Sequence, residues 1–247
     1  MTCETPLPGN IQPVPLEQTY LLFNHGPATL ASARYDGITN VMAASWVCGL
    51  DTSPPKLTAV LGRESKTREL AEKSGYFVIQ IPTAAQLELV YQAGHRSGFD
   101  DPEKLQHCGI ELQRIADVDL PFIAGCSAWL ICKIIPVPEN QNTYDLFIAE
   151  IVGAWADQRV FSAGRWKFEI AAPALRSLHY IAGGRFYAIG EELDANSHEL
   201  TPGASQPASD SNGSAREVIV GGPIPERLSA VIGAPRARTT PASSAST

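Results

Sequence analysis

The stretch NVMAASWVCGL, residues 40–50, has the apolar character of a β-strand, yet it places three small side chains directly before a tryptophan. The small residues are Ala43, Ala44 and Ser45, and the tryptophan is Trp46. A buried strand usually prefers bulky β-branched or aromatic side chains. Small side chains instead allow a flat molecule to lie against the backbone, so this stretch predicts a strand that lines a binding surface.

The bulk composition limits the classes of protein to which the chain can belong. Its 247 residues are 44% hydrophobic, which suffices for one sizeable core or at most two small ones. The net charge of −7 and the pI of about 5.2 argue against a general nucleic-acid binder and against a polybasic membrane surface. No apolar run approaches the roughly 18 residues that a membrane-spanning helix needs.

The N-terminus and the cysteines indicate a cytoplasmic protein. Residues 1–10 lack the basic start and apolar core of a secretory signal. The cysteines are odd in number, widely spread and outside any C-x-x-C pair, which favours neither a disulfide framework nor a zinc knuckle. They are Cys3, Cys48, Cys108, Cys126 and Cys132.

A change in composition near residue 195 divides the chain into two regions. No Phe, Trp or Tyr follows Tyr187, and the later region is rich in Ser, Pro, Gly and Ala. Such a composition cannot bury enough apolar surface to offset its ordering entropy. Residues 195–247 are therefore predicted to be mostly disordered, with one apolar segment, 216–233, that could dock on the body or bind a partner. Residues 1–194 are predicted to form one domain.

Long apolar, β-branched runs predict the strands of that domain. They span residues 57–62, 76–82, 126–137 and 143–157. The last two flank PENQN, residues 138–142, a polar turn that indicates an antiparallel hairpin. Runs of this length suit strands that are buried on part of both faces.

Helices are expected to be short and few. Three candidates run from a polar N-cap to a glycine: Ser65 to Gly75, Thr83 to Gly94, and Asp101 to Gly109. Thr83 and Gln86 have capping-box spacing, and Pro102 suits a first helical position. Because regular βαβ alternation and G-x-G-x-x-G are absent, a Rossmann fold is disfavoured, and a mainly β barrel with a few peripheral helices fits better.

The segment that follows the run 57–62 predicts an anion site. The chain also lacks G-x-S-x-G, H-E-x-x-H and P-loop motifs, and its histidines lack metal-ligand spacing. Arg63, Ser65, Lys66 and Thr67 follow the end of that strand directly and stand at the start of a helix. Backbone N–H groups, hydroxyls and cations converging on one spot suit a phosphate. The alternative is that the hydroxyls only cap the helix and the cations are only solvated.

The turn SPP, residues 53–55, joins the strand 40–48 to the strand 57–62, so the two strands are expected to be neighbours. A flat aromatic ligand on Ala43, Ala44 and Ser45 would then place a phosphate near the helix start at Ser65. A ring system attached to a phosphate describes flavin mononucleotide, FMN.

Several segments in order carry a resemblance to a known family. They are NVMAASWVCGLDTSPPKLTAVLG (40–62), RESKTRELAEKSGYFVIQIP (63–82) and LHYIAGGRFYAIGE (178–191). Together they resemble the flavin reductase-like family, which includes the flavoredoxins and has the FMN-binding split β-barrel fold. The segment 93–112 is also similar, although PEKL replaces the family's D-K-F-like pattern. The resemblance covers roughly residues 15–192.

The resemblance implies a homodimer of split barrels with FMN near the dimer interface. The residues implied to line the isoalloxazine ring, largely through backbone groups, are Asn40, Val41, Met42, Ala43, Ala44, Ser45 and Trp46. Those implied to hold the phosphate are Arg63, Ser65, Lys66 and Thr67. Trp46 is then a packing wall, with a plain core aromatic as the alternative.

Three further features each allow two interpretations. His179, Gly183, Gly184 and Arg185 stand where the family places a loop near the flavin edge, which suggests nicotinamide or partner access; a barrel-closing strand with a Gly-Gly bend is the alternative. Cys48 is either a redox partner of the flavin or, as favoured here, a small buried apolar residue. His95 and Arg96 either contact a ligand or form an exposed loop pair.

The function implied by the resemblance is an NAD(P)H-dependent flavin reductase in which hydride passes from C4 of the nicotinamide to N5 of FMN. The cofactor carries this chemistry, and no catalytic side chain is needed. Its partners are then flavin and nicotinamide nucleotides, a second copy of the chain and a candidate protein electron acceptor. The alternatives are a flavoredoxin-like electron carrier and a non-catalytic flavin-binding module whose tail recruits partners.

Overall fold

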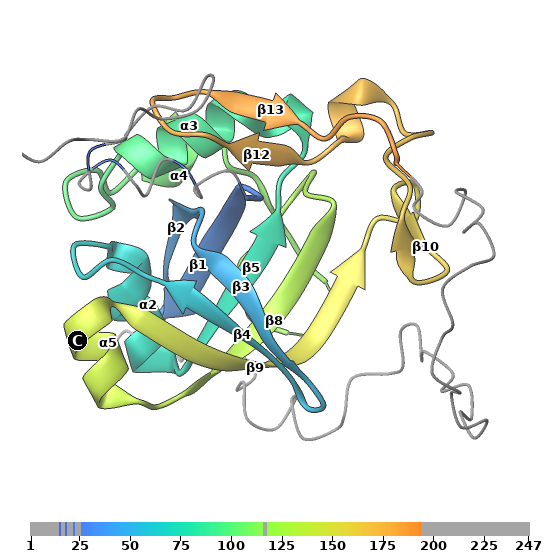
Figure 1. The fold of residues 1–247 in the computed structure, drawn as a ribbon. Coiled ribbons are helices and arrows are strands. Elements are labelled where there is room, and N and C mark those ends of the chain that lie inside the picture. The colour runs from blue at the N-terminus through green and yellow to red at the C-terminus, as the bar shows by residue number, and fades with distance from the viewer. Residues whose placement is uncertain (1–14, 16–17, 19–21, 23–25, 116–117, 194–247) are drawn as a thin grey trace, which may run out of the picture.

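A computed structural model describes residues 15, 18, 22, 26–115 and 118–193 (Figure 1). The predicted tail, residues 195–247, lies outside the described residues. Within them, no helix is long and apolar enough to cross a membrane.

A seven-stranded antiparallel sheet forms the body of the protein (Figure 1). Its spatial order is β2-β1-β5-β8-β9-β4-β3. The strands are β1 (Thr29–Tyr35), β2 (Ile38–Ala44), β3 (Val47–Thr52), β4 (Pro55–Val60), β5 (Tyr76–Ile81), β8 (Ala128–Ile135) and β9 (Leu146–Ala156). The strands predicted over 57–62, 76–82, 126–137 and 143–157 are present as β4, β5, β8 and β9, and β8 pairs with β9 antiparallel, as expected.

The two edge strands of the sheet are consecutive in the sequence. Only Ser45 and Trp46 separate β2 from β3, although five strands lie between them in the sheet order. So short a link spans at most roughly 10 Å. The sheet must therefore curl until its two edges approach each other, which produces a barrel.

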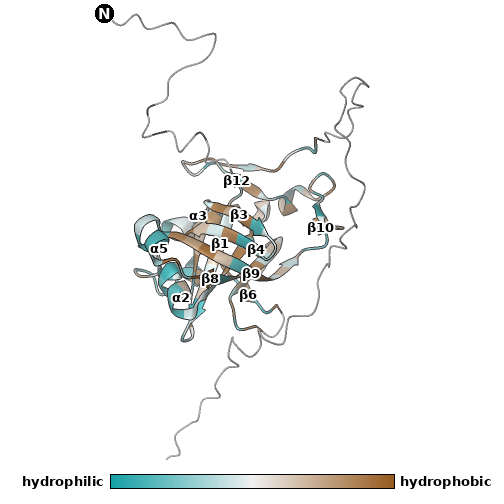
Figure 2. Cartoon of the chain, turned by 60° about the horizontal axis from the view of Figure 1, so that its bottom comes forward, coloured by the Kyte–Doolittle hydropathy of each residue, from teal (hydrophilic) through white to brown (hydrophobic). Residues whose placement is uncertain are grey.

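Alternating side chains of the strands enter two different hydrophobic clusters. On β5, Phe77 and Ile79 belong to a cluster that draws on strands all around the barrel and on the helix α2 (Lys66–Ser74), whereas Val78 belongs to a cluster shared with α3 (Leu87–His95). The strands are therefore buried on parts of both faces, as their long apolar runs predict. Figure 2 shows this hydrophobic character of the strands beside the hydrophilic α2.

The helix signals in the sequence are local, and two of the three are confirmed closely. Ser65 caps α2 and Gly75 ends it with a left-handed φ of 77°. The capping box of Thr83 and Gln86 is present, and it starts the 3-10 turn η2 (Ala84–Gln86), which leads into α3. The third helix, α4 (Lys104–His107), is shorter than expected, although the Asp101 side chain accepts the hydrogen bond from the Glu103 amide that an N-cap residue makes.

Two expectations about the strands are wrong. The segment PENQN is not a turn but the start of a helix, α5 (Pro138–Tyr144), in which Pro138 takes the first helical position that suits its fixed φ. The strand expected over 40–48 is interrupted at Ser45. Consequently β3 pairs with β4, but the small-residue strand β2 pairs with β1 instead.

Three short two-stranded units complete the fold. They are β6 (Leu112–Gln113) with β7 (Phe122–Ile123), β10 (Phe161–Ser162) with β11 (Arg165–Trp166), and β12 (Leu178–Tyr180) with β13 (Phe186–Ala188). A 3-10 turn, η3 (Pro173–Leu175), precedes β12. In Figure 1 the β12–β13 hairpin lies beside α3, close to the barrel end where β2 finishes.

A buried cation ties α2 to the segment that precedes β9. The Arg68 side chain is 9% exposed and bonds to Asp145 at 2.5 Å, to the Gln141 carbonyl at 2.9 Å and to Glu72 at 3.0 Å. Its guanidinium also lies 5.3 Å from the ring centroid of Phe147. Asp145 is the central partner, and it ends α5 with a left-handed φ of 56°.

The substitution Asp145→Asn tests this pair, because asparagine tolerates the left-handed backbone but cannot balance the Arg68 charge. We expect the free energy of unfolding to fall by about 2 kcal/mol, since the buried Arg68 charge then keeps only the more exposed carboxylate of Glu72 as its counter-charge. Urea denaturation measures the change. The control is Asp51→Asn, which removes an exposed partner of Lys56 and should change stability little. Equal losses in the two variants would contradict this assignment.

Candidate functional site

Two cavities adjoin each other between β2, α3 and the N-terminus of α2. They have volumes of about 270 and 260 Å³. Both are lined by Ala43, Gly94 and His95, so they meet at these three residues. We call the first the apolar cavity and the second the polar cavity, after the side chains that line the rest of each.

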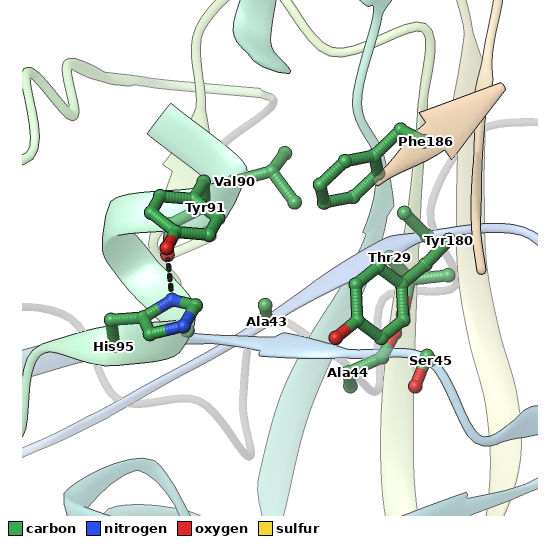
Figure 3. A pocket seen from close by; sticks show the side chains of 11 residues that line it. Thr29, Ala43, Ala44, Ser45, Val90, Tyr91, His95, Tyr180 and Phe186 are labelled. Carbon is green, nitrogen blue, oxygen red and sulfur yellow. Dashed lines mark hydrogen bonds between the residues drawn. The ribbon is translucent and has the colours of Figure 1, made fainter. Parts of the chain in front are cut away.

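The apolar cavity is a slot between small residues and aromatic rings (Figure 3). Ala43, Ala44 and Ser45 at the end of β2 form one side. Val90, Tyr91 and His95 of α3 form a second side, and Tyr180 and Phe186 of the β12–β13 hairpin face them across the cavity. The small residues Ala43, Ala44 and Ser45 therefore lie where a flat group can approach the backbone, as the sequence predicts.

The hairpin is held against α3 by a close backbone approach. Gly183 and Gly184 have left-handed φ values of 62° and 72°. A Cβ atom on Gly184 would lie 3.0 Å from Cε2 of Tyr91, so only glycine fits this approach without a shift. The Gly-Gly bend expected from the sequence is thus present, but it belongs to a separate two-stranded sheet rather than to the barrel.

The polar cavity lies at the N-terminus of α2. Ser65 and Lys66 line it, together with Asn40 and Met42 of β2 and with Arg96, Ser97 and Gly98 of the loop after α3. The Ser65 hydroxyl accepts a bond from the Arg68 amide at 3.4 Å and lies 3.0 Å from the Met42 sulfur. The helix start contributes a partial positive charge that favours an anion. Glu64 also lines the cavity and opposes an anion on that side.

Lys104 is the most informative residue of the polar cavity. It is 3% exposed, it lines the cavity, and it forms no ion pair with any acidic residue among residues 26–115 and 118–193. Burial lowers the pKa of its ammonium group, and Cys108 and Asp101 oppose that shift only in part. A buried cation without a counter-charge is unfavourable unless an anion joins it.

The carboxamide of Asn40 fixes the geometry of this cavity. Asn40 is 3% exposed and donates a hydrogen bond of 2.9 Å to the Thr67 hydroxyl, which joins β2 to the first turn of α2. A Cβ atom on Gly98 would lie 2.2 Å from the Asn40 side-chain oxygen, so the loop after α3 packs directly on this amide. Three segments distant in the sequence thus meet at one side chain.

The structure brings together only part of the predicted binding set. Asn40, Met42, Ala43, Ala44, Ser45, Ser65 and Lys66 line one or both of the two cavities, whereas Val41, Trp46, Arg63, Thr67, His179 and Arg185 line neither. Val41 is fully buried in the core. Arg63 bonds to Asp145 at 3.2 Å instead, and Thr67 bonds to Asn40. Their roles toward a ligand remain predictions.

Two individual expectations about β3 and its approach are corrected. Cys48 is exposed rather than buried, and every residue of the edge strand β3 from Cys48 to Thr52 is exposed with it. Trp46 is 50% exposed and therefore is not a core aromatic. His95 and Arg96 are exposed, but they also line the cavities, so both interpretations offered for this pair contain part of the observed geometry.

Comparison with known proteins identifies the family. The family model described as "Flavin reductase like domain" matches residues 22–186. The chain belongs to the flavin reductase-like family. The expected family and its mainly β split-barrel fold are confirmed.

Individual relatives, found by structure and by sequence, agree with this family. A structure described as an FMN-binding domain of flavin reductases-like enzyme from Shewanella baltica is 60% identical, with a TM-score of 0.68 over 74% of this chain and 95% of that one. The flavoredoxin of Desulfovibrio vulgaris shares the fold at 23% identity and a TM-score of 0.58, over 69% and 89% of the two chains. Uncharacterized protein YddH of Escherichia coli is 34% identical over 186 residues, 74% of this chain and 97% of that protein.

The substitution Gly98→Ala tests the packing around the polar cavity. The added methyl group would press on Asn40, so we expect a loss of about 1–3 kcal/mol in the free energy of unfolding, measured by urea denaturation. Gly49→Ala is the matched control, because a Cβ atom there meets nothing within 4 Å. A Gly98 variant as stable as the control would show that the loop does not rest on Asn40.

Proposed function

We propose that the chain binds FMN across the two cavities and acts as an NAD(P)H-dependent flavin reductase. The observation that carries the FMN proposal is the pairing of an apolar slot with an adjoining cavity that is lined by Lys104, a buried lysine without an acidic partner among the described residues. A ligand that suits both has a planar ring at one end and an anion at the other. FMN has this form, and family membership supports it.

The polar cavity fits a phosphate group. Positive charge comes from two elements: Lys104 on α4, and Lys66 together with the helix N-terminus on α2. The Lys66 ammonium is shared with Glu69 at 3.0 Å and lies 4.9 Å from the ring centroid of Phe99, whereas Lys104 has no acidic partner among the described residues. Lys104 is therefore the proposed principal counter-charge of the phosphate, although nothing in the sequence distinguishes this lysine beyond its place in PEKL.

The chain's own residues would then bind and orient the flavin. The end of β2 presents backbone groups and little side-chain bulk to the ring, while Tyr180 and Phe186 cover the opposite side and exclude water. Bound FMN would supply the redox chemistry, accepting hydride from the nicotinamide. His179 and Arg185 remain proposed contacts for the nicotinamide or a protein partner, because they belong to the hairpin that covers the apolar cavity.

A homodimer is part of the proposal. The edge strand β3 and its approach leave Trp46 and Leu50 about half exposed, at 50% and 51%. Exposed apolar side chains on an unpaired sheet edge favour association. Ala44 and Ser45 stand at the junction of β2 and β3 and also line the apolar cavity, so the proposed dimer surface lies beside that cavity.

The substitution Lys104→Met tests the phosphate site. We expect FMN affinity to fall by about 10- to 100-fold, because a charge-assisted hydrogen bond is lost, and riboflavin affinity to stay unchanged, because riboflavin has no phosphate. Quenching of flavin fluorescence measures both constants. The control is Lys133→Met, which removes an exposed lysine of β8 outside the cavities. Equal weakening of both ligands would contradict a role toward the phosphate.

The pH dependence of FMN binding provides a second test of the same residue. Burial lowers the pKa of Lys104, so its positive charge is lost at a lower pH than that of an ordinary lysine, whose pKa is about 10.4. Only the charged form attracts phosphate. We therefore expect FMN affinity to decline with rising alkaline pH, at pH values below the ordinary lysine pKa. Riboflavin, which has no phosphate, is the reference ligand. The decline should be absent in Lys104→Met.

Anaerobic addition of NADH or NADPH to the FMN-loaded protein tests the reductase activity. We expect the visible flavin absorbance to bleach as the nicotinamide is oxidised. Bound FMN that resists both nucleotides would contradict the reductase and favour the flavoredoxin-like carrier, which takes its electrons from a protein. Failure to bind FMN at all would overturn both.

A further inference from the structure

The junction between the two cavities contains one side chain that can form hydrogen bonds. Of the three residues shared by the cavities, Ala43 and Gly94 carry no polar side-chain atom, and the third is His95 at the end of α3. Any ligand that occupies both cavities must pass this point. Of the three residues shared by the cavities, His95 is therefore the one whose side chain can form a hydrogen bond with the middle segment of such a ligand.

The orientation of that imidazole is fixed by its own helix. Nδ1 of His95 lies 2.8 Å from the backbone carbonyl oxygen of Tyr91, and the two rings pack at 4.1 Å between centroids (Figure 3). A carbonyl oxygen only accepts hydrogen bonds, so Nδ1 carries the hydrogen. The neutral ring then offers Nε2 as an acceptor, and Figure 3 shows this second nitrogen on the side that faces β2.

We propose that His95 recognises the hydroxyl-bearing chain that links the ring of the ligand to its phosphate, by accepting a hydrogen bond from a ribityl hydroxyl at Nε2. This inference rests on the proposed FMN binding and assigns a specificity-determining contact within it. Each part of the ligand then contacts a different group of residues. The small and aromatic residues bind the ring, His95 binds the ribityl chain, and Lys104 binds the phosphate. A ligand of similar ends but an apolar linker would lose the middle contact.

Three flavins that differ in one segment at a time test the assignment. Lumiflavin has the ring without the polyol chain, riboflavin adds the chain, and FMN adds the phosphate. The variant His95→Phe keeps an aromatic ring against Tyr91 but removes both nitrogens. We expect it to bind riboflavin and FMN about 3- to 10-fold more weakly than the wild type, as for one lost hydrogen bond, and lumiflavin equally well.

Two further variants give the matched comparisons. His95→Gln, whose amide can again meet a hydroxyl, should recover part of the riboflavin affinity. Lys104→Met should weaken FMN alone, which separates the phosphate contact from the polyol contact. Dissociation constants from fluorescence titration of the full chain provide the readout, independent of any reductase activity.

The outcomes distinguish this inference from the function on which it rests. Wild-type protein that binds no flavin overturns the proposed function and the inference together. Wild-type protein that binds FMN, with riboflavin affinity unchanged in His95→Phe, overturns only the inference. A loss confined to FMN, or a loss of equal size for lumiflavin, also overturns it, because His95 would then act on the phosphate or merely shape the ring cavity.

Discussion

The two-residue link between β2 and β3 is the constraint on which the architecture depends. Ser45 and Trp46 join strands that lie at opposite ends of the sheet order, so the sheet closes toward a barrel rather than remaining open. Closure explains the alternating burial of β5, whose side chains supply a barrel cluster and an outer cluster in turn. The residues of the link belong to neither strand, although the Trp46 carbonyl still accepts a hydrogen bond from the Val60 amide of β4.

The position of the candidate site follows from this seam. β2 is an edge strand paired only with β1, so its last residues are open to elements that arrive later in the chain. α3 and the β12–β13 hairpin take that place, and Gly184 allows the hairpin to approach Tyr91 closely. Small side chains at the end of β2 then leave a slot instead of a filled core. The composition that looked unsuitable for a buried strand is suited to the edge of a cavity.

Sequence signals predicted the elements whose causes are local. A capping serine, a left-handed glycine and a capping box lie within a few residues of the helices they define, and all three are observed. The misreading of PENQN has the same origin, since Pro138 is compatible with both a turn and a first helical position. The partner of β2 could not be predicted, because sheet pairing depends on contacts far apart in the chain. Ser65 and Lys66 of the predicted anion site line the polar cavity, but so does Lys104, which only the tertiary fold brings there.

Two buried cations, Arg68 and Lys104, differ in how their removal from water is compensated. Arg68 is enclosed by Asp145, Glu72 and the Gln141 carbonyl, so its charge is balanced within the protein and its partners bind α2 to the barrel. Lys104 is buried to a similar degree, yet no acidic side chain in the described part of the chain pairs with it, and its pKa is lowered accordingly. A fold stabilised only from within would gain by replacing such a lysine with an apolar residue. The position of Lys104 beside a helix N-terminus and an adjoining apolar slot therefore supports the proposed anionic ligand, which would complete the charge balance that the protein itself leaves open.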